Sequence, residues 1–205
     1  SNDDCYITGN FDNTLRYYEN NQQHHVNSSG SSDIFIAKMN SSGSWQWVIG
    51  SGGSGQDKGL GIVIDSTDNI WVTGFFHGTA VFGSMNISAS GDYDVFFARL
   101  NSSGAWQAVG RAGGATTVLG TNIAVDSSDG IYLTGYFEDT ATFGNTLLTT
   151  NGGFDLFITK LTASGGLQWA VKAGGLSTDY GHAVAVDSTG NVYVTGYFGN
   201  TAAFG

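Results

Sequence analysis

A five-residue motif occurs four times in the sequence at almost constant spacing, and it restricts the chain to a repetitive architecture. The motif is a small or apolar residue, an aromatic residue, an apolar residue, threonine and glycine. Its copies begin at residues 5, 70, 131 and 192, which gives spacings of 65, 61 and 61 residues. A fixed period of this length indicates one supersecondary unit that buries its apolar face against its neighbours. We therefore expect a single repeat array over residues 1–205, with units 5–69, 70–130 and 131–191 and a partial unit 192–205.

Each unit is a series of short segments rich in β-branched and aromatic residues, separated by Gly, Ser, Asn and Asp. Unit 131–191 contains, in order, YLTGYF, TATFG, TLLTT, DLFITKL, LQWAVKA and HAVAVD. No segment keeps a helical period, and DLFITKL is apolar on both faces, as in a strand inside stacked sheets. The pattern predicts an all-β fold in which each unit forms one antiparallel blade. A sandwich, barrel, propeller or β-solenoid would fit it.

The composition restricts the function classes. Seven Lys and Arg stand against 17 Asp and Glu, and the net charge is −10, so the basic surface that nucleic-acid binding needs is absent. No apolar run approaches the ~20 residues of a membrane span, so we expect no membrane insertion. Charged residues make up 12%, about half the usual share, which suits a secreted or self-associating protein. We expect an extracellular or cell-surface location. The single cysteine, Cys5, excludes an intrachain disulfide and is expected to be buried.

Several segments together resemble the β-propeller repeat of bacterial secreted and cell-surface proteins. They are GNVYVTGYF (190–198), TATFG (140–144), DLFITKL (155–161), QWAVKAGG (168–175) and AVAVD (183–187). The resemblance covers almost the whole chain and implies four-stranded, propeller-like blades. The AVAVD-type strand would be innermost, followed by the VYVTG, DLFITKL and QWAVKA types. The TATFG–TLLTT stretch would be a hairpin excursion between the second and third strands.

The number of units predicts an incomplete propeller. Propellers close with about 4–8 blades, whereas this sequence holds three units and 14 further residues. Either the chain is a piece of a longer array, or separate copies complete one another. Unpaired strand edges favour association with other strands. We therefore expect the partner to be another copy of the repeat, in the same longer chain or in a neighbouring molecule, which gives an oligomer or a filament.

Two tight turns carry paired carboxylates that are candidates for a metal site. Asp65 and Asp68 in one turn, and Asp126 and Asp129 in the next, are three residues apart. Oxygen ligands of this kind suit Ca²⁺. Because Gly190 replaces the second carboxylate in the third unit, we favour turn formation over Ca²⁺ binding. No other cofactor is expected.

A second set of charged residues also repeats. Each DLFITKL-type segment begins with aspartate and has a basic residue five positions later; these residues are Asp33 and Lys38, Asp94 and Arg99, and Asp155 and Lys160. We expect them to be structural, each with a partner in its own or the adjacent blade; the alternative is a ring of ligand-binding groups. Asp57 and Asp179, in the connections between units, are expected to be surface or capping carboxylates, since Val118 takes their place in the second unit.

The sequence offers no catalytic residues. It contains no nucleophile elbow, metal-binding helix or phosphate loop. The first hypothesis is a non-enzymatic extracellular structural or adhesive module. The alternative is a lectin-like carbohydrate-binding propeller, for which Trp47 and Trp71 are candidate sugar platforms, although we favour core packing for both. A third interpretation, a propeller-scaffold polysaccharide lyase or glycosidase, would depend on the irregular region 15–29, which contributes Arg16, Glu19, His24 and His25.

Overall fold

A computed structural model describes residues 3–204 of the protein, and this part of the chain is built from strands without any helix. It accordingly contains no helix of the length and hydropathy that crossing a membrane requires. The strands are β1 (Cys5–Phe11), β2 (Thr14–Glu19), β3 (Gln22–Asn27), β4 (Asp33–Met39), β5 (Trp45–Gly53), β6 (Lys58–Ile64), β7 (Ile70–Phe76), β8 (Thr79–Phe82), β9 (Met85–Ser88), β10 (Asp94–Leu100), β11 (Trp106–Gly114), β12 (Val118–Val125), β13 (Ile131–Phe137), β14 (Thr140–Phe143), β15 (Thr146–Thr149), β16 (Asp155–Leu161), β17 (Leu167–Gly175), β18 (Asp179–Val186), β19 (Val192–Phe198) and β20 (Ala202–Phe204).

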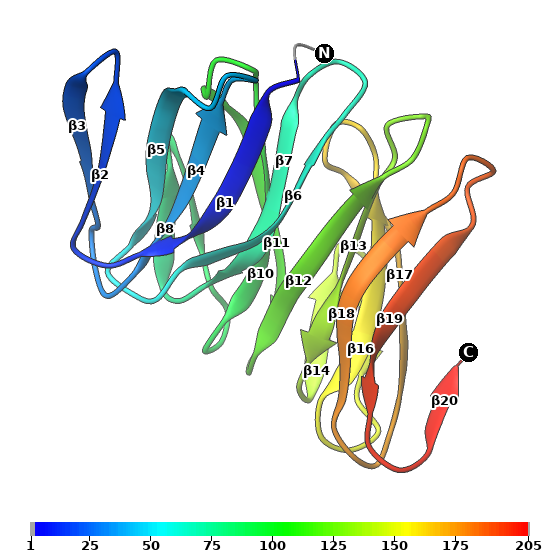
Figure 1. The fold of residues 1–205 in the computed structure, drawn as a ribbon. Coiled ribbons are helices and arrows are strands. Elements are labelled where there is room, and N and C mark those ends of the chain that lie inside the picture. Colours follow the sequence, from blue (N-terminus) through cyan, green and yellow to red (C-terminus); the bar gives the residue numbers. More distant parts are fainter. Residues whose placement is uncertain (1–2, 205) are drawn as a thin grey trace.

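The strands form antiparallel blades that lie side by side in chain order (Figure 1). The second blade has the order β6-β7-β10-β11, and the third has the order β12-β13-β16-β17. The first blade is formed by β1, β4 and β5, and the last sheet by β18 and β19. This architecture confirms the expected all-β, propeller-like fold, and the strand order within a blade is the one that the resemblance implied.

From the second unit onward the hairpin pairs with the blade before its own, whereas the β2–β3 hairpin of the first unit forms a separate two-stranded sheet. The β14–β15 hairpin is part of the third unit, yet β14 pairs with β11 of the second blade. In the same way, β8–β9 extends the first blade and β20 extends the third. Unit 70–130 therefore contributes strands to three blades, and the expectation that each unit builds one blade is wrong. The repeat and the blade are therefore out of phase, since the hairpin and the last strand of the unit belong to the sheets on either side of it.

Glycine at the end of each outer strand permits this pairing. A Cβ atom on Gly114 would lie 1.8 Å from the carbonyl oxygen of Thr140, so no side chain can be accommodated without a shift of the backbone. Gly53 and Gly175 are equally close to the corresponding carbonyl oxygens, at 1.8 and 1.9 Å. Gly135 of the repeated motif has the same constraint inside a blade, since its Cβ would lie 1.9 Å from the oxygen of Leu119.

The core lies between blades rather than within one sheet. Strand β7 is buried at all seven positions, because one face packs on the first blade and the other on the third. Between the first two blades, Ile34, Phe76 and Phe96 belong to one apolar cluster. Between the second and third blades, Trp71 and Phe137 belong to another. Each blade is therefore stabilised mainly by its neighbours.

Cys5 differs from the expectation of burial. It is exposed, whereas its counterparts Ile70 and Ile131 are fully buried. Those two residues are covered by an innermost strand, but no strand of the described residues pairs with the inner edge of β1. The exposure of Cys5 thus follows from the unpaired inner edge of β1 and not from its position in the motif.

We predict that Gly114→Ala lowers the free energy of unfolding by about 2 kcal/mol, because the new methyl group forces the β14 backbone away from β11. Urea denaturation followed by tryptophan fluorescence would measure the change. Gly166→Ala is the matched control: its nearest neighbour is the Thr162 hydroxyl at 3.3 Å, and we expect a change within about 0.5 kcal/mol. Equal effects of the two substitutions would contradict the close-approach explanation.

Candidate functional site

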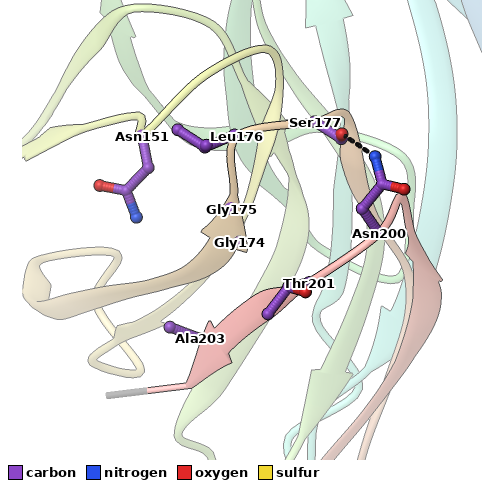
Figure 2. A pocket seen from close by; sticks show the side chains of 8 residues that line it. All are labelled: Asn151, Gly174, Gly175, Leu176, Ser177, Asn200, Thr201 and Ala203. Atoms are coloured by element: carbon purple, nitrogen blue, oxygen red, sulfur yellow. Dashed lines mark hydrogen bonds between the residues drawn. The ribbon is translucent and has the colours of Figure 1, made fainter.

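A similar groove occurs at two blade junctions. At the junction between the third blade and the last sheet it has a volume of about 490 Å³ and lies between the end of β17 and β20, as Figure 2 shows. Its lining residues are Asn151, Gly174, Gly175, Leu176, Ser177, Asn200, Thr201 and Ala203. A groove of about 610 Å³ lies at the equivalent place between the second and third blades, where Ser90, Gly113, Gly114 and Thr140 hold the corresponding positions.

Most residues that line the two grooves have small or polar uncharged side chains, and Arg111 is the basic residue among them. In Figure 2 the Asn200 amide donates a hydrogen bond of 2.7 Å to the Ser177 hydroxyl. This bond joins the turn between β19 and β20 to the connection between β17 and β18. Arg111 lines the larger groove. None of the described residues that line the two grooves is aromatic. The grooves can offer backbone and amide hydrogen bonds to a neutral polar ligand, but no platform for stacking on a sugar ring.

The repeated aspartates that begin β4, β10 and β16 lie beneath these junctions and are almost completely buried. Each carboxylate accepts a hydrogen bond from the backbone N–H four residues earlier, as in Ser90 to Asp94 at 2.9 Å. Asp94 also forms an ion pair with Arg111, and Asp155 forms one with Lys172 at 2.8 Å. The basic residues paired with Asp94 and Asp155 thus lie 17 residues later, on the adjacent strand. They are not the repeated basic residues five positions later on the same strand.

The basic residues five positions after the aspartates lie at the opposite end of the same strands. Their polar partners are Asp4 for Lys38 (2.9 Å), the carbonyl oxygen of Ala163 in the third blade for Arg99 (2.9 Å), and Asp126 for Lys160 (3.3 Å). Each charged group also lies over the ring at the second motif position: Tyr6 at 5.5 Å, Trp71 at 5.6 Å and Tyr132 at 4.7 Å. The structural role of these six repeated residues remains a prediction, and each basic group already has a partner in its own or the adjacent blade.

The turn carboxylates proposed as Ca²⁺ ligands are engaged in hydrogen bonds. Asp65 accepts five of them, from backbone and side-chain groups of Thr67 and Asn69 and from the Trp71 indole. Burial acts to raise the pKa of Asp65, but the bonds from Asn69 and Thr67 outweigh it and lower the pKa below its usual value. Asp126 has a similar environment, and its pKa is lowered in the same way.

The second carboxylate of each turn has a conformational role. Asp68 and Asp129 both have φ of 61°, and Gly190 at the equivalent position has φ of 87°. Asp and Gly are among the residues that tolerate this left-handed region. Asp129 also accepts hydrogen bonds from the Ser66 backbone and hydroxyl, at 2.8 and 2.6 Å. Across residues 3–204, no group of three or more His, Cys, Asp or Glu is arranged to hold a metal ion.

Sequence reasoning missed the partner of the turn aspartate. The aromatic residue six positions later donates a hydrogen bond to it in three units: Trp71 to Asp65 at 3.2 Å, Tyr132 to Asp126 at 2.9 Å and Tyr193 to Asp187 at 3.1 Å. The constant spacing of six residues was the available signal. Trp71 is buried and therefore offers no platform for a sugar, while Trp47 packs against the Tyr6 ring at 6.1 Å.

Comparison with known proteins agrees with this architecture. Residues 168–197, which run from β17 into β19, match the family described as Beta-propeller repeat. The match confirms the resemblance to β-propeller repeats. The chain is also similar to "Uncharacterized WD repeat-containing protein L264" of Acanthamoeba polyphaga mimivirus, with 25% identity over 186 residues. That alignment covers 75% of this chain and 13% of the relative, so the chain spans a small part of that protein. The fold and the match together support a β-propeller repeat module.

We predict that Asp65→Ala lowers the free energy of unfolding by about 1–3 kcal/mol at pH 7, because the Thr67, Asn69 and Trp71 donors lose their acceptor. The folded-state pKa of Asp65 is lowered, so this contribution is present at neutral pH and is lost on acidification below about pH 4.

Urea denaturation at pH 7 and at pH 3 would measure the difference. If the turn bound Ca²⁺ instead, a chelator would lower the melting temperature of the wild type. We expect EDTA to leave the melting temperature of the wild type unchanged. A drop that Ca²⁺ reverses, and that Asp65→Ala abolishes, would establish a calcium site.

Proposed function

We propose that this chain is a non-enzymatic structural or adhesive repeat module of an extracellular or cell-surface protein, and that its blades associate with further blades of the same kind. The main observation behind this proposal is that phenylalanine side chains at equivalent repeat positions differ in their solvent exposure. Phe76 and Phe137 are fully buried, but Phe198 at the same repeat position is 48% exposed. Phe82 and Phe143 are buried, but Phe204 is 66% exposed.

The exposed groups form one apolar surface beside β19. A groove of about 370 Å³ is lined there by residues that include Leu156, Val194, Phe198 and Phe204. The outer edge of β19 has no partner strand among residues 3–204. Unpaired backbone groups and exposed aromatic rings on one strand favour the addition of another strand.

The occupant that fits this edge is a DLFITKL-type strand of a further repeat. In the three described blades such a strand pairs with the motif strand in one register, which places phenylalanine opposite the motif glycine: Gly9 and Phe35, Gly74 and Phe96, Gly135 and Phe157. Gly196 is the corresponding position on β19. A strand supplied by another repeat would cover Phe198 and Phe204 as β10 and β16 cover their counterparts.

The comparisons support the same proposal. The net charge of −10 opposes the association of identical chains, so the association depends on the exposed apolar residues of β19 and β20 and not on charge. The family match and the similarity to a WD-repeat protein support a repeat module. Adhesion and extracellular location rest on the composition and on the resemblance to secreted repeats.

A lectin-like carbohydrate-binding module is the second candidate. It is favoured by the recurrence of one groove at two junctions, which is how a multivalent binder presents equivalent sites. A glycan array probed with the purified chain would test it. Binding that is lost when Asn200 and Ser177 are changed to alanine, with an unchanged melting temperature, would favour this candidate over the structural one.

The assembly proposal predicts that an added half-blade stabilises the protein. A copy of residues 145–178, joined after Gly205, would supply strands equivalent to β15, β16 and β17. We expect the 205-residue chain to self-associate with increasing concentration in light scattering, and the extended chain to self-associate less and to melt at a higher temperature.

The matched control carries the same extension with aspartate in place of the appended copy of Phe157, the residue that faces the motif glycine. This control should gain little, because a buried charge opposes the pairing. A stable 21.5 kDa monomer whose melting temperature the extension does not raise would overturn the proposal.

A further inference from the structure

The junction between the first and second blades differs from the other two junctions in its charges. Five positions are equivalent at the three junctions. At the first junction they are Ser32, Asp33, Gly50, Ser51 and Asp57. At the second they are Tyr93, Asp94, Arg111, Ala112 and Val118, and at the third they are Phe154, Asp155, Lys172, Ala173 and Asp179. The second junction has one carboxylate and one cation. The third has two carboxylates and one cation. The first has two carboxylates and, at Gly50, no cation.

The two carboxylates of the first junction are buried and converge on one point. Asp33 is 2% exposed and Asp57 is 0% exposed. A Cβ atom on Gly52 would lie 2.8 Å from Oδ1 of Asp33 and 2.8 Å from Oδ2 of Asp57. The two oxygens therefore approach the same glycine, one from the first residue of β4 and the other from the connection between β5 and β6. Two ionised carboxylates in this position would repel each other without the screening of solvent.

The hydrogen bonds leave one oxygen without a partner. Asp57 accepts from the backbone N–H of Gly53 at 2.7 Å and from that of His77 at 3.1 Å. Asp33 accepts through Oδ2 from the N–H of Ser29 at 2.8 Å. Oδ1 of Asp33 is buried and has no hydrogen-bond partner among the described residues, and the same is true of Oδ1 in Asp94 and in Asp155. At the first junction this oxygen and Oδ2 of Asp57 both lie 2.8 Å from the Cβ position of Gly52, so a second carboxyl group is beside it.

Asp57 also connects the two blades. Gly53 is the last residue of β5 in the first blade, and His77 follows β7 in the second. The other titratable groups around Asp57 are His77 itself, Lys58, whose ammonium lies over the Phe75 ring at 6.0 Å, and Tyr93, whose ring is 5.7 Å from the His77 ring. Among residues 3–204, neither Asp33 nor Asp57 forms an ion pair.

We propose that the Asp33–Asp57 pair holds one proton, which Asp57 donates to the unpartnered oxygen of Asp33, and that this proton makes the first junction an acid-stabilised joint between blades. When the pair loses the proton to solvent, two buried carboxylates face each other and the joint weakens. At the second and third junctions Arg111 and Lys172 form ion pairs with Asp94 and Asp155, so the carboxylate that corresponds to Asp33 has a cation beside it there.

The titration range follows from the surroundings. Burial is the largest influence and, with the nearby Asp33 charge, raises the pKa of Asp57 to about 6, against the bonds from Gly53 and His77. The folded-state pKa is therefore above the unfolded value of 3.8, so the folded protein holds the proton more tightly. The resulting stability is present in acid and is lost as the pH rises through about 6.

The experiment compares the pH dependence of folding in two substituted proteins. Asp57→Val introduces the residue that the second junction has at this position. Asp179→Val is the matched control at the third junction, where Lys172 remains beside Asp155. From pH 5 to pH 8 we expect the folding constant of the wild type to fall about tenfold more than that of Asp57→Val. Asp179→Val should keep the wild-type dependence. All three proteins carry His77→Gln in this comparison, because His77 lies beside Asp57 and its own contribution would differ between the wild type and Asp57→Val.

A ¹³C titration of the aspartate carboxyls in the wild-type chain tests the proposal without any substitution. We expect one carboxyl of the pair to titrate near pH 6. The proposal is overturned by a pair that is fully ionised at pH 5, or by an unchanged pH dependence in Asp57→Val. It is also overturned if Ca²⁺ at pH 8 shifts both carboxyl signals and restores the acid stability, since the pair would then hold a cation and not a proton.

Discussion

The approach of a hairpin backbone to a glycine at the end of the preceding outer strand determines how this array holds together. A carbonyl oxygen occupies the place where a Cβ atom would be at Gly53, Gly114 and Gly175. The outer strand of each of these blades is thus covered by the next unit. Because exposed outer edges are where sheets add foreign strands, this arrangement directs pairing toward the chain's own successor. The apolar residues of β8 and β14 can then enter the cores between blades.

Repetition separates structural positions from the places where this chain departs from its own pattern. The turn aspartate and its aromatic donor have the same geometry in three units, so a role in each unit explains them fully. The informative positions are those where one unit differs, such as Gly50 in place of a basic residue. At that position the loss of the cation leaves the buried Asp33 without the ion pair that Asp94 and Asp155 form.

Much of the fold could be predicted from the sequence, because the period fixed the strand types and the resemblance supplied their order. The destination of the hairpin could not be predicted, since alternation identifies a buried face but not the sheet that buries it. The partner of Asp94 was missed for a related reason. Five residues along one strand span about 16 Å, so Arg99 lies at the far end, while Arg111 is brought near by antiparallel pairing. The exposure of Cys5 depends on a neighbouring strand and not on its own residue type.

The offset between repeat and blade has a mechanical consequence. Because unit 70–130 supplies strands to three successive sheets, pulling on the chain at its ends cannot extract that unit while leaving its neighbours folded. We therefore expect the array to resist a force applied along the chain, because neighbouring units share their sheets. Its weakest element should be the last sheet, where β18 and β19 are joined to the third blade by packing, by side-chain hydrogen bonds such as the one from the Val184 N–H to Asn122 at 3.0 Å, and by the short strand β20.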